Sequence, residues 1–453
     1  MIIAELLSRM EAAADREALV TDEAAWTYRS ILARSGELLR VFDEKGLRAG
    51  DPVSLVADYH GDSIATLIAL LKRNAFISLI PDIESELQEP FLRIVEPRWV
   101  LRIGHQGGAT ITSRQADPQI QPLHAELLAR GHAGLVMFSS GSERTPKAVV
   151  HDFHTFLTRF DQPSRPSKGL AFMQFDHVGG IYNLFSSLFN QGTLHFSQKR
   201  DPDLIAALIE RHRIEFFPMS ASYMNLMVLQ KPWLRHDLSS LKAIVYGSER
   251  PSEHVVRQLS AALPGVTLHQ NYGLTEVCLL RSKSRSRDST WLRITDPMAQ
   301  VRVVDGKVQV RSALTMLGYL NAPHSVTPDG WYETGDLAEQ DGEWIRVLGR
   351  SSQMISVGGR KVSPEAVEEV LQQIPGVADV VVNAVPNPLL GQSVRAVFQL
   401  TDPGKTDPRE FRMRVRAFCA DRLKAYEAPS QIEISEEALM GRRLKKRRTL
   451  QDR

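Results

Sequence analysis

Short apolar runs alternate with amphipathic helical patterns along the first two thirds of the chain. The runs include DPVSLVAD, AFISLIP, GLVMFSS and LKAIVYGS, and the segments between them, such as HGDSIATLIALLKR and HVVRQLSAALPG, have helical spacing. This alternation predicts an α/β fold of stacked strand and helix layers. The first 20 residues mix acids with apolar side chains and are typical of an amphipathic helix.

The pattern changes twice in the last third of the chain. After about Asp296, QVRVVDGKVQVRS predicts a hairpin that turns at its central Asp-Gly pair, and GEWIRVLGR predicts another strand. From Lys361, VSPEAVEEVLQQIPG predicts a helix with a proline start and a glycine stop, followed by two strands and a helix. We therefore expect a large N-terminal domain with a β subdomain over residues 1–350 and a small, mobile C-terminal α+β domain over residues 351–453.

Composition excludes several classes of protein. Of 453 residues, 43% are hydrophobic, as in ordinary globular proteins, and 55 basic residues against 53 acids give a net charge of only +2. Cys278 and Cys419 lie far apart without metal-ligand spacing, which argues against a disulfide framework or a zinc site. No segment approaches the roughly 20 apolar residues of a membrane span. We expect a cytoplasmic protein with no nucleic-acid and no membrane partner.

The most informative segment is GLVMFSSGSERTPKAVVHD. An apolar strand over residues 134–138 leads into a loop whose amides and hydroxyls suit phosphate oxygens, and Lys147 adds a positive charge. It is not a GxxxxGKS/T phosphate loop, because Pro146 precedes the lysine and no helix begins there. Taken alone, the segment fits a polar surface turn equally well.

Three later motifs add complementary chemistry. NYGLTEV offers an aromatic ring, a hydroxyl and a carboxylate, a set suited to a base, a phosphate and a magnesium ion. YETGDL places Asp336 after a glycine turn, where a carboxylate can accept both hydroxyls of a ribose. VLGRSSQMISVGGRK brings Arg350 to the end of a strand and Gly358 and Gly359 to a flexible turn.

In their order and spacing these motifs resemble the adenylate-forming superfamily of acyl-CoA synthetases, standalone peptide-synthetase adenylation domains and luciferases. The resemblance covers nearly the whole chain and includes WTYRSILARSGELL, LLKRNAFISLIPD, YGSERP and LKAYEAPSQIE. It implies activation of a carboxylic acid by ATP as an acyl-adenylate. It also implies that the small domain would then turn about a hinge and admit a thiol.

The resemblance also implies roles for individual residues. Tyr272 would stack on the adenine, Thr275 would bind the phosphate that becomes AMP, and Glu276 would coordinate magnesium. Asp336 and Arg350 would hold the ribose. The residues implied to bind ATP are Ser139, Ser140, Gly141, Ser142, Lys147, Gly247, Ser248, Glu249, Tyr272, Gly273, Thr275, Asp336 and Arg350.

FDHVGG lies where the family places its acyl-pocket motif. His177 resembles the histidine of the FHxxG motif, which lies beside the substrate carboxylate. In a different alignment, Asp176 matches the aspartate with which amino-acid-activating members hold the substrate amine. Gly179 and Gly180 complete this pocket prediction. The alternative is that His177 is an ordinary hydrogen-bonded histidine with no role in substrate binding.

The phosphate loop departs from the family's SGTTGxPKG pattern. Glu143 stands in place of threonine, Arg144 in place of the first of the two later glycines, and Ala148 in place of the last. Loss of glycine predicts a less mobile loop. Glu143 adds a negative charge close to the phosphates, which would lower the affinity for ATP unless it pairs with Arg144 or with a metal.

The hinge and the C-terminal lysine also differ from the family. Ser352 stands at the hinge position, where Asp or Lys is common, while Gly358 and Gly359 are expected along the thiol channel. The family's GKxxR pattern has no clean counterpart in GRRLKKRRTL. We assign the catalytic lysine to Lys445, with Lys446 close behind, although anchoring on RRTL puts a leucine there. The basic tail also fits a solvated surface segment.

Together these features predict an ATP- and magnesium-dependent acid-thiol ligase that acts on a small carboxylic acid, with CoA as the thiol. Its catalytic residues would be Lys147, His177, Thr275, Glu276 and Lys445. Magnesium and cationic groups are needed because two anions, a carboxylate and the α-phosphate, meet in the transition state. The alternatives are a standalone enzyme that loads a separate carrier protein, an amide-forming ligase, and a member that binds nucleotide without catalysis.

Overall fold

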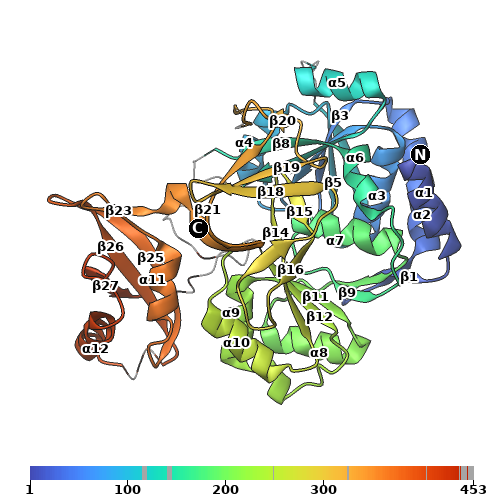
Figure 1. The fold of residues 1–453 in the computed structure, drawn as a ribbon. Helices are drawn as coiled ribbons and strands as arrows, with labels where there is room; N and C mark the ends of the chain where they lie inside the picture. The colour runs from blue at the N-terminus through green and yellow to red at the C-terminus, as the bar shows by residue number, and fades with distance from the viewer. Residues whose placement is uncertain are drawn as a thin grey trace.

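The computed structural model describes residues 1–114, 120–139, 145–247, 249–323, 326–402, 404, 406–437, 439 and 446. Helices and strands alternate through the first two thirds, and strands dominate the last third, as the hydrophobic pattern predicts. The fold is mixed α/β, with a large N-terminal domain and a smaller C-terminal domain, drawn in orange and red in Figure 1.

One seven-stranded sheet and the helices packed on it comprise β1 (Glu17–Val20), β2 (Ala25–Thr27), β9 (Lys168–Leu170), β10 (Thr193–His195), β11 (Phe216–Ser220), β12 (Ala243–Gly247), β13 (Thr267–Gln270), α8 (Pro202–His212), α9 (Ala221–Gln230) and α10 (Glu253–Ala262). The strand order is β13-β12-β11-β9-β10-β1-β2. All neighbouring pairs are parallel except β1 with β2. The three helices and four of the strands, from β9 to β13, share one hydrophobic cluster.

A second seven-stranded sheet comprises β3 (Pro52–Val56), β4 (Phe76–Ile80), β5 (Trp99–Ile103), β6 (Ala109–Ser113), β7 (Gly134–Ser139), β8 (Lys147–Asp152) and β20 (Gly318–Tyr319), with helices α4 (Ser85–Val95) and α5 (Pro122–Arg130). Its order is β20-β8-β7-β4-β3-β5-β6. The central strands are parallel, and β6, β8 and β20 run antiparallel to their neighbours. Their nearly continuous burial fits a sheet covered on both faces.

Further helices share one hydrophobic cluster with both sheets. Leu19 of the first sheet and Ile77 of the second belong to the same cluster, so the two sheets have a common core. The helices of this middle region are α1 (Ile2–Ala12), α2 (Tyr28–Lys45), α3 (Gly61–Lys72), α6 (Phe153–Leu157) and α7 (Val178–Phe189). Within the described ranges, no helix combines the length and apolar composition that crossing a bilayer requires.

The predicted β subdomain is confirmed. It contains the short pair β14 (Tyr272–Leu274) and β15 (Cys278–Leu280), and a six-stranded antiparallel sheet of β16 (Ser282–Ser284), β17 (Leu292–Ile294), β18 (Ala299–Val304), β19 (Lys307–Ser312), β21 (Tyr332–Asp341) and β22 (Trp344–Arg350). The predicted hairpin joins β18 to β19, and its turn residues Asp305 and Gly306 both have positive φ, at 50° and 72°. Two positive φ values match the right-handed twist of a hairpin.

The smaller domain has its own sheet and core. It follows the turn η3 (Ser351–Gln353) and contains β23 (Ile355–Val357), β24 (Arg360–Val362), α11 (Pro364–Leu371), β25 (Val377–Asn387), β26 (Gly391–Leu400), α12 (Pro408–Ala420) and β27 (Gln431–Ile434). The strand order is β24-β23-β26-β25, with β27 parallel to β26. One hydrophobic cluster lies entirely within this domain.

Two element boundaries differ from the sequence prediction. The N-terminal helix ends at Ala12, and Glu17–Val20 forms a strand whose Leu19 is fully buried beside β10. Helix α11 begins at Pro364, capped by the Ser363 hydroxyl, but ends at Leu371 rather than near Gly376. Sheet pairing with a distant strand overrides the local helical pattern in the first case.

Candidate active site

The predicted site segments leave the carboxyl ends of sheet strands, where ligands bind in open α/β sheets. Ser139 is the last residue of β7, and Gly247 is the last residue of β12. Asp176 and His177 follow β9, and Tyr272 follows β13. Tertiary contacts join several of these segments.

A buried cluster forms around Asp336. Antiparallel pairing of β21 with β22 sets Asp336 directly opposite Arg350, and Arg350 Nε lies 3.5 Å from Asp336 Oδ1. The Tyr272 hydroxyl donates to Asp336 Oδ2 at 2.8 Å. Burial raises the pKa of Asp336, while the Arg350 charge and the Tyr272 hydrogen bond oppose that rise. The three residues predicted for adenosine therefore meet at one point.

Tyr319 contacts both Lys147, the predicted phosphate-binding residue, and Glu276, the predicted magnesium ligand. Its hydroxyl donates to Glu276 Oε1 at 2.8 Å, and Lys147 Nζ lies 5.9 Å from the centre of its ring. Burial raises the pKa of Tyr319, so the phenol stays protonated and donates. Pairing of β20 with β8 places Tyr319 opposite Val149, two residues beyond Lys147.

His151 connects the same strand, β8, to Thr275. Its Nε2 lies 2.7 Å from the Thr275 carbonyl oxygen, and its Nδ1 lies 3.8 Å from Cys278 Sγ. Burial lowers the pKa of His151 to about 4, so the ring is neutral near pH 7. A carbonyl only accepts, so Nε2 carries the ring proton and donates to Thr275. The turn with Thr275 is thereby attached to the strand that begins at Lys147.

The ends of the predicted phosphate loop are held together. Ser139 pairs directly with Lys147 across β7 and β8. The Asn321 side chain donates to the Pro146 carbonyl and accepts from the Ala148 amide, both at 2.9 Å. Ser140, Gly141 and Ser142 lie outside the described residues, as do Glu143 and Arg144, where the sequence departs from the family pattern.

Close backbone approach explains two predicted glycines. A Cβ on Gly247 would lie 2.8 Å from the Asn271 carbonyl oxygen, and a Cβ on Gly273 would clash with the Cys278 carbonyl oxygen. Next to Gly247, Ser248 lies outside the described residues.

Glu249, in the same YGSERP motif, links three segments. Its Oε2 accepts from the Ser222 hydroxyl at 2.6 Å, and its Oε1 accepts from the Lys446 amide at 3.1 Å. Both oxygens of the carboxylate are thereby used within the protein in this structure.

FDHVGG forms a tight turn that starts α7. His177 caps the helix, and its Nδ1 accepts from the Gly179 amide at 3.1 Å. A Cβ on Gly180 would clash with the Gln174 carbonyl oxygen, and the Tyr59 hydroxyl donates to the Gly180 carbonyl at 3.0 Å. Asp176, just before the cap, is buried. Since Nδ1 accepts, the neutral His177 ring carries its proton on Nε2.

The structure separates the two candidate lysines. Lys445 lies outside the described residues, whereas Lys446 is largely buried. Its ammonium lies 3.1 Å from Glu368, 3.2 Å from Asp379 and 2.8 Å from the Val380 carbonyl. These partners belong to the small domain itself, so Lys446 stabilises that domain in this structure.

The predicted hinge and thiol-channel residues lie in turns. Ser352 is exposed in η3, directly after β22. Gly358 and Gly359 have φ of 55° and 82° and form the turn between β23 and β24. Positive φ at both positions explains why the turn uses glycine.

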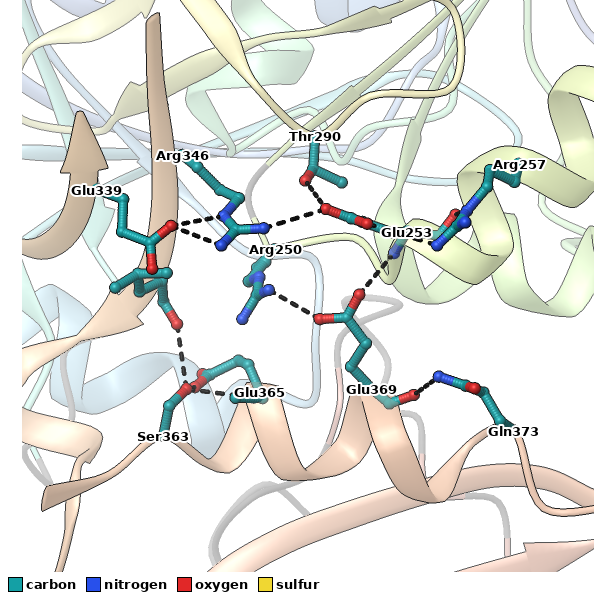
Figure 2. Close-up of polar contacts among 12 residues, drawn as sticks. Arg250, Glu253, Arg257, Thr290, Glu339, Arg346, Ser363, Glu365, Glu369 and Gln373 are labelled. Carbon is teal, nitrogen blue, oxygen red and sulfur yellow. Dashed lines mark hydrogen bonds and ion pairs between the residues drawn. The ribbon is translucent and has the colours of Figure 1, made fainter. Parts of the chain in front are cut away.

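Polar contacts hold the small domain against the large one (Figure 2). Glu369 of α11 accepts from Arg250 at 2.8 Å and from the Glu253 amide at 3.2 Å. The Ser363 hydroxyl donates to the Leu348 carbonyl at 3.2 Å. The Asn225 side chain also donates to the small domain, at the Ala378 carbonyl, 3.0 Å away.

One group of side chains away from these motifs has a metal-like arrangement: His132, Asp152 and His154. His154 Nδ1 accepts from the Ala133 amide at 3.1 Å, so the other ring nitrogen carries the proton and has no lone pair for a metal. Arg130 also lies 3.2 Å from Asp152. The group therefore fits an internal hydrogen-bond network.

Sequence reasoning missed Tyr319, Asn321 and His151. All three act through the pairing of β20 with β8 or through the packing of the Thr275 turn on β8. The only sequence signal was the GYLN segment before YETGDL. Its tyrosine and asparagine are two positions apart, so in an extended chain both side chains point to the same side.

Comparison with known proteins gives matches over most of the chain. The family model for AMP-binding enzyme matches residues 7–320, and that for AMP-binding enzyme C-terminal domain matches residues 366–446. A 2-succinylbenzoate–CoA ligase of Bacillus pumilus (strain SAFR-032) is 24% identical over 471 residues, covering 95% of this chain and 94% of the relative.

Solved structures show the same architecture. The anthranilate CoA ligase AuaEII, in complex with anthranoyl-AMP, superimposes with a TM-score of 0.80 at 19% identity, covering 96% of this chain and 93% of that one. The amide bond synthetase McbA of Marinactinospora thermotolerans has a TM-score of 0.76 at 22% identity, with 98% of each chain covered. At these identities the likeness concerns the fold.

Proposed function

The chain belongs to the family of AMP-binding enzymes, and on that premise we propose that it joins a carboxylic acid to a thiol. ATP and the acid form an acyl-adenylate with release of pyrophosphate, and the thiol of CoA then attacks the acyl carbon with release of AMP. The named CoA ligase among its relatives supports this acceptor.

The observation that carries the proposal is the convergence on β8 and β20. Lys147, Thr275 and Glu276 come from two distant motifs, yet Tyr319 and His151 hold them at one strand pair. A cation, a hydroxyl and a carboxylate are the groups that phosphoryl chemistry needs at its charged centre.

Glu276 fits a magnesium ion. Its side chain is largely buried, and of its two carboxylate oxygens only Oε1 has a hydrogen-bond donor among the described residues. Hard cations prefer such carboxylate oxygens. When bound, the ion would offset the negative charge of the ATP phosphates as the carboxylate approaches.

The remaining residues act by binding and orientation. Asp336, flanked by Tyr272 and Arg350, would accept the ribose hydroxyls, which fixes the α-phosphate relative to Thr275. His177 would lie beside the substrate carboxylate. We place the domain boundary after Arg350. Lys445 would be the lysine that reaches the substrate carboxylate during adenylation. Positioning of this kind supplies much of the rate.

A product assay tests the proposal. Purified protein is incubated with ATP, magnesium and a panel of aryl, alkyl and amino acids, and AMP and acyl-thioester are quantified with CoA, a carrier protein or an amine as acceptor. The proposal predicts acid-dependent AMP and an acyl-CoA product. AMP without any thioester, accompanied by an amide, would assign the amide-forming alternative instead.

A further inference from the structure

Arg200 lies close to two aromatic rings. It follows β10, and its guanidinium carbon lies 4.6 Å from the centre of the Phe172 ring and 5.5 Å from that of Phe196. Cation–π contacts of this kind hold the guanidinium near the rings but give its five N–H groups no oxygen or nitrogen acceptor. These donors are therefore open to a further partner.

Those donors have no acceptor among the described residues. Within the part of the chain that the structure describes, no residue forms a hydrogen bond or an ion pair with Arg200, although the side chain is partly buried. Asp58, Tyr59 and Tyr223 act on it only through longer-range electrostatics, which partly offsets the lowering of the Arg200 pKa by burial. A guanidinium remains charged in proteins, so its donors here are open to water or to an anionic ligand.

Contacts connect Arg200 to the predicted acyl pocket. Phe172 lies on the segment between β9 and α7 that also carries Asp176 and His177. Phe196 packs on Tyr59 with ring centres 5.3 Å apart. Tyr59 in turn donates to the Gly180 carbonyl in FDHVGG. Arg200 therefore borders the segment proposed to receive the acid.

We propose that Arg200 binds a second negatively charged group on the acid substrate, so that the enzyme prefers dicarboxylic acids. A carboxylate can accept two parallel hydrogen bonds from one guanidinium, which gives both affinity and orientation. Phe172 and Phe196 would shield this pair from water. The inference rests on the proposed function and names its substrate class.

The test compares matched acids that differ only in the second carboxylate: glutarate against pentanoate, and benzene-1,3-dicarboxylate against benzoate. Acid-dependent exchange of pyrophosphate into ATP gives kcat and KM for each acid with the wild type, Arg200→Met and Arg200→Lys. Lys199→Leu is the control, because this neighbouring lysine is exposed in the same loop. Thermal unfolding establishes that each variant is folded.

The proposal predicts that the wild type prefers the dicarboxylate of at least one pair. Arg200→Met should raise KM for that acid roughly 10- to 100-fold, the usual effect of losing a hydrogen bond to a charged group, with little change for its monocarboxylate partner. Arg200→Lys should restore part of the preference because it keeps the charge, and Lys199→Leu should leave it intact.

Three results would overturn the inference. The first is a wild-type preference for monocarboxylates in both pairs, and the second is an equal loss of activity on both members of a pair in Arg200→Met. The third is a rise confined to the KM of ATP, which would assign Arg200 to a phosphate. Absence of exchange with every acid would instead refute the proposed function, and the inference would fall with it.

Discussion

His151 is a neutral, buried donor whose one strong hydrogen bond holds the Thr275 turn on β8. We predict that His151→Ala lowers kcat for adenylation by roughly 10-fold or more, because loss of a buried hydrogen-bond partner lets the turn move. His151→Asn should recover part of the rate. Cys278→Ala keeps the bond to Thr275 and is the control. Steady-state exchange kinetics measure all three, and equal rates for wild type and His151→Ala would contradict the assignment.

Gly180 tests the geometry of the acyl-pocket turn. Gly180→Ala places a methyl group against the Gln174 carbonyl oxygen and should destabilise the fold by about 1–3 kcal/mol, as forced overpacking does. Gly36, inside helix α2, has nothing within 4 Å of its added Cβ. Gly36→Ala should therefore be neutral or stabilise by up to about 1 kcal/mol. Urea unfolding measures both, and similar values would refute the tight turn.

The candidate residues of the site came from the order of the motifs and their resemblance to adenylate-forming enzymes, and their roles stay predictions. Asp336 and Arg350 were named from sequence, and the structure brings them together. Tyr319 and His151 were not predictable, since their partners depend on strand register and on the packing of a turn. Arg200 follows an ordinary strand, and only the two rings close to it distinguish it.

At the level of elements, strand β10 carries a buried histidine at an apolar position. His195 has no hydrogen-bond partner for either ring nitrogen among the described residues. Burial lowers its pKa to about 3, and the neighbouring His212 and Lys168 add to the effect. The unfolded chain takes up this proton below about pH 6.5, so stability falls as pH decreases from there toward 3.

We predict that His195→Phe flattens this pH dependence. Its free energy of unfolding should fall less steeply than that of the wild type below pH 6.5, by up to about 1.4 kcal/mol per pH unit. Urea unfolding at several pH values provides the measurement. Parallel curves for the two proteins would mean that His195 does not titrate as its burial requires.

Long, strongly patterned elements were predicted correctly, including the hairpin of β18 and β19 and strands β25 and β26. The strand Glu17–Val20 was missed, because its partner β10 lies far along the chain and local spacing favours a helix there. Its buried Leu19 belongs to the shared core of the two sheets. A pairing of this kind leaves no local trace in the sequence.

At the scale of the whole molecule, Glu369 joins the small domain to the large one (Figure 2). The Arg250 side chain is almost buried, and two of its nitrogens have no acceptor among the described residues. Glu369→Ala therefore leaves a poorly paired charge at the interface, a change that typically costs about 2–5 kcal/mol. We predict that it shifts the protein away from this domain arrangement.

Hydrogen–deuterium exchange measures that shift. Protection in α11 and in the first residues of the small domain, 351–363, should fall by at least about 10-fold in Glu369→Ala. Gln373→Ala is the control, because that side chain, just beyond the end of α11, donates to the Glu369 carbonyl within the small domain. Unchanged protection in Glu369→Ala would show that the ion pair does not hold the domains.

The order and relative size of the two domains followed from the hydrophobic pattern, since each domain has its own core. Their contact did not, because Arg250 and Glu369 lie in unrelated motifs and either could be an ordinary surface charge. Relative placement depends on which surfaces meet, and periodicity carries no information on that.

Activation of a carboxylic acid by ATP is tested most directly by acid-dependent exchange of labelled pyrophosphate into ATP. The wild type should exchange label only when a suitable acid and magnesium are both present. Lys147→Ala, which removes the cation beside Tyr319, should reduce the rate roughly 10- to 100-fold. Exchange that needs no acid, exchange that no acid supports, or an unchanged rate in Lys147→Ala would contradict the account.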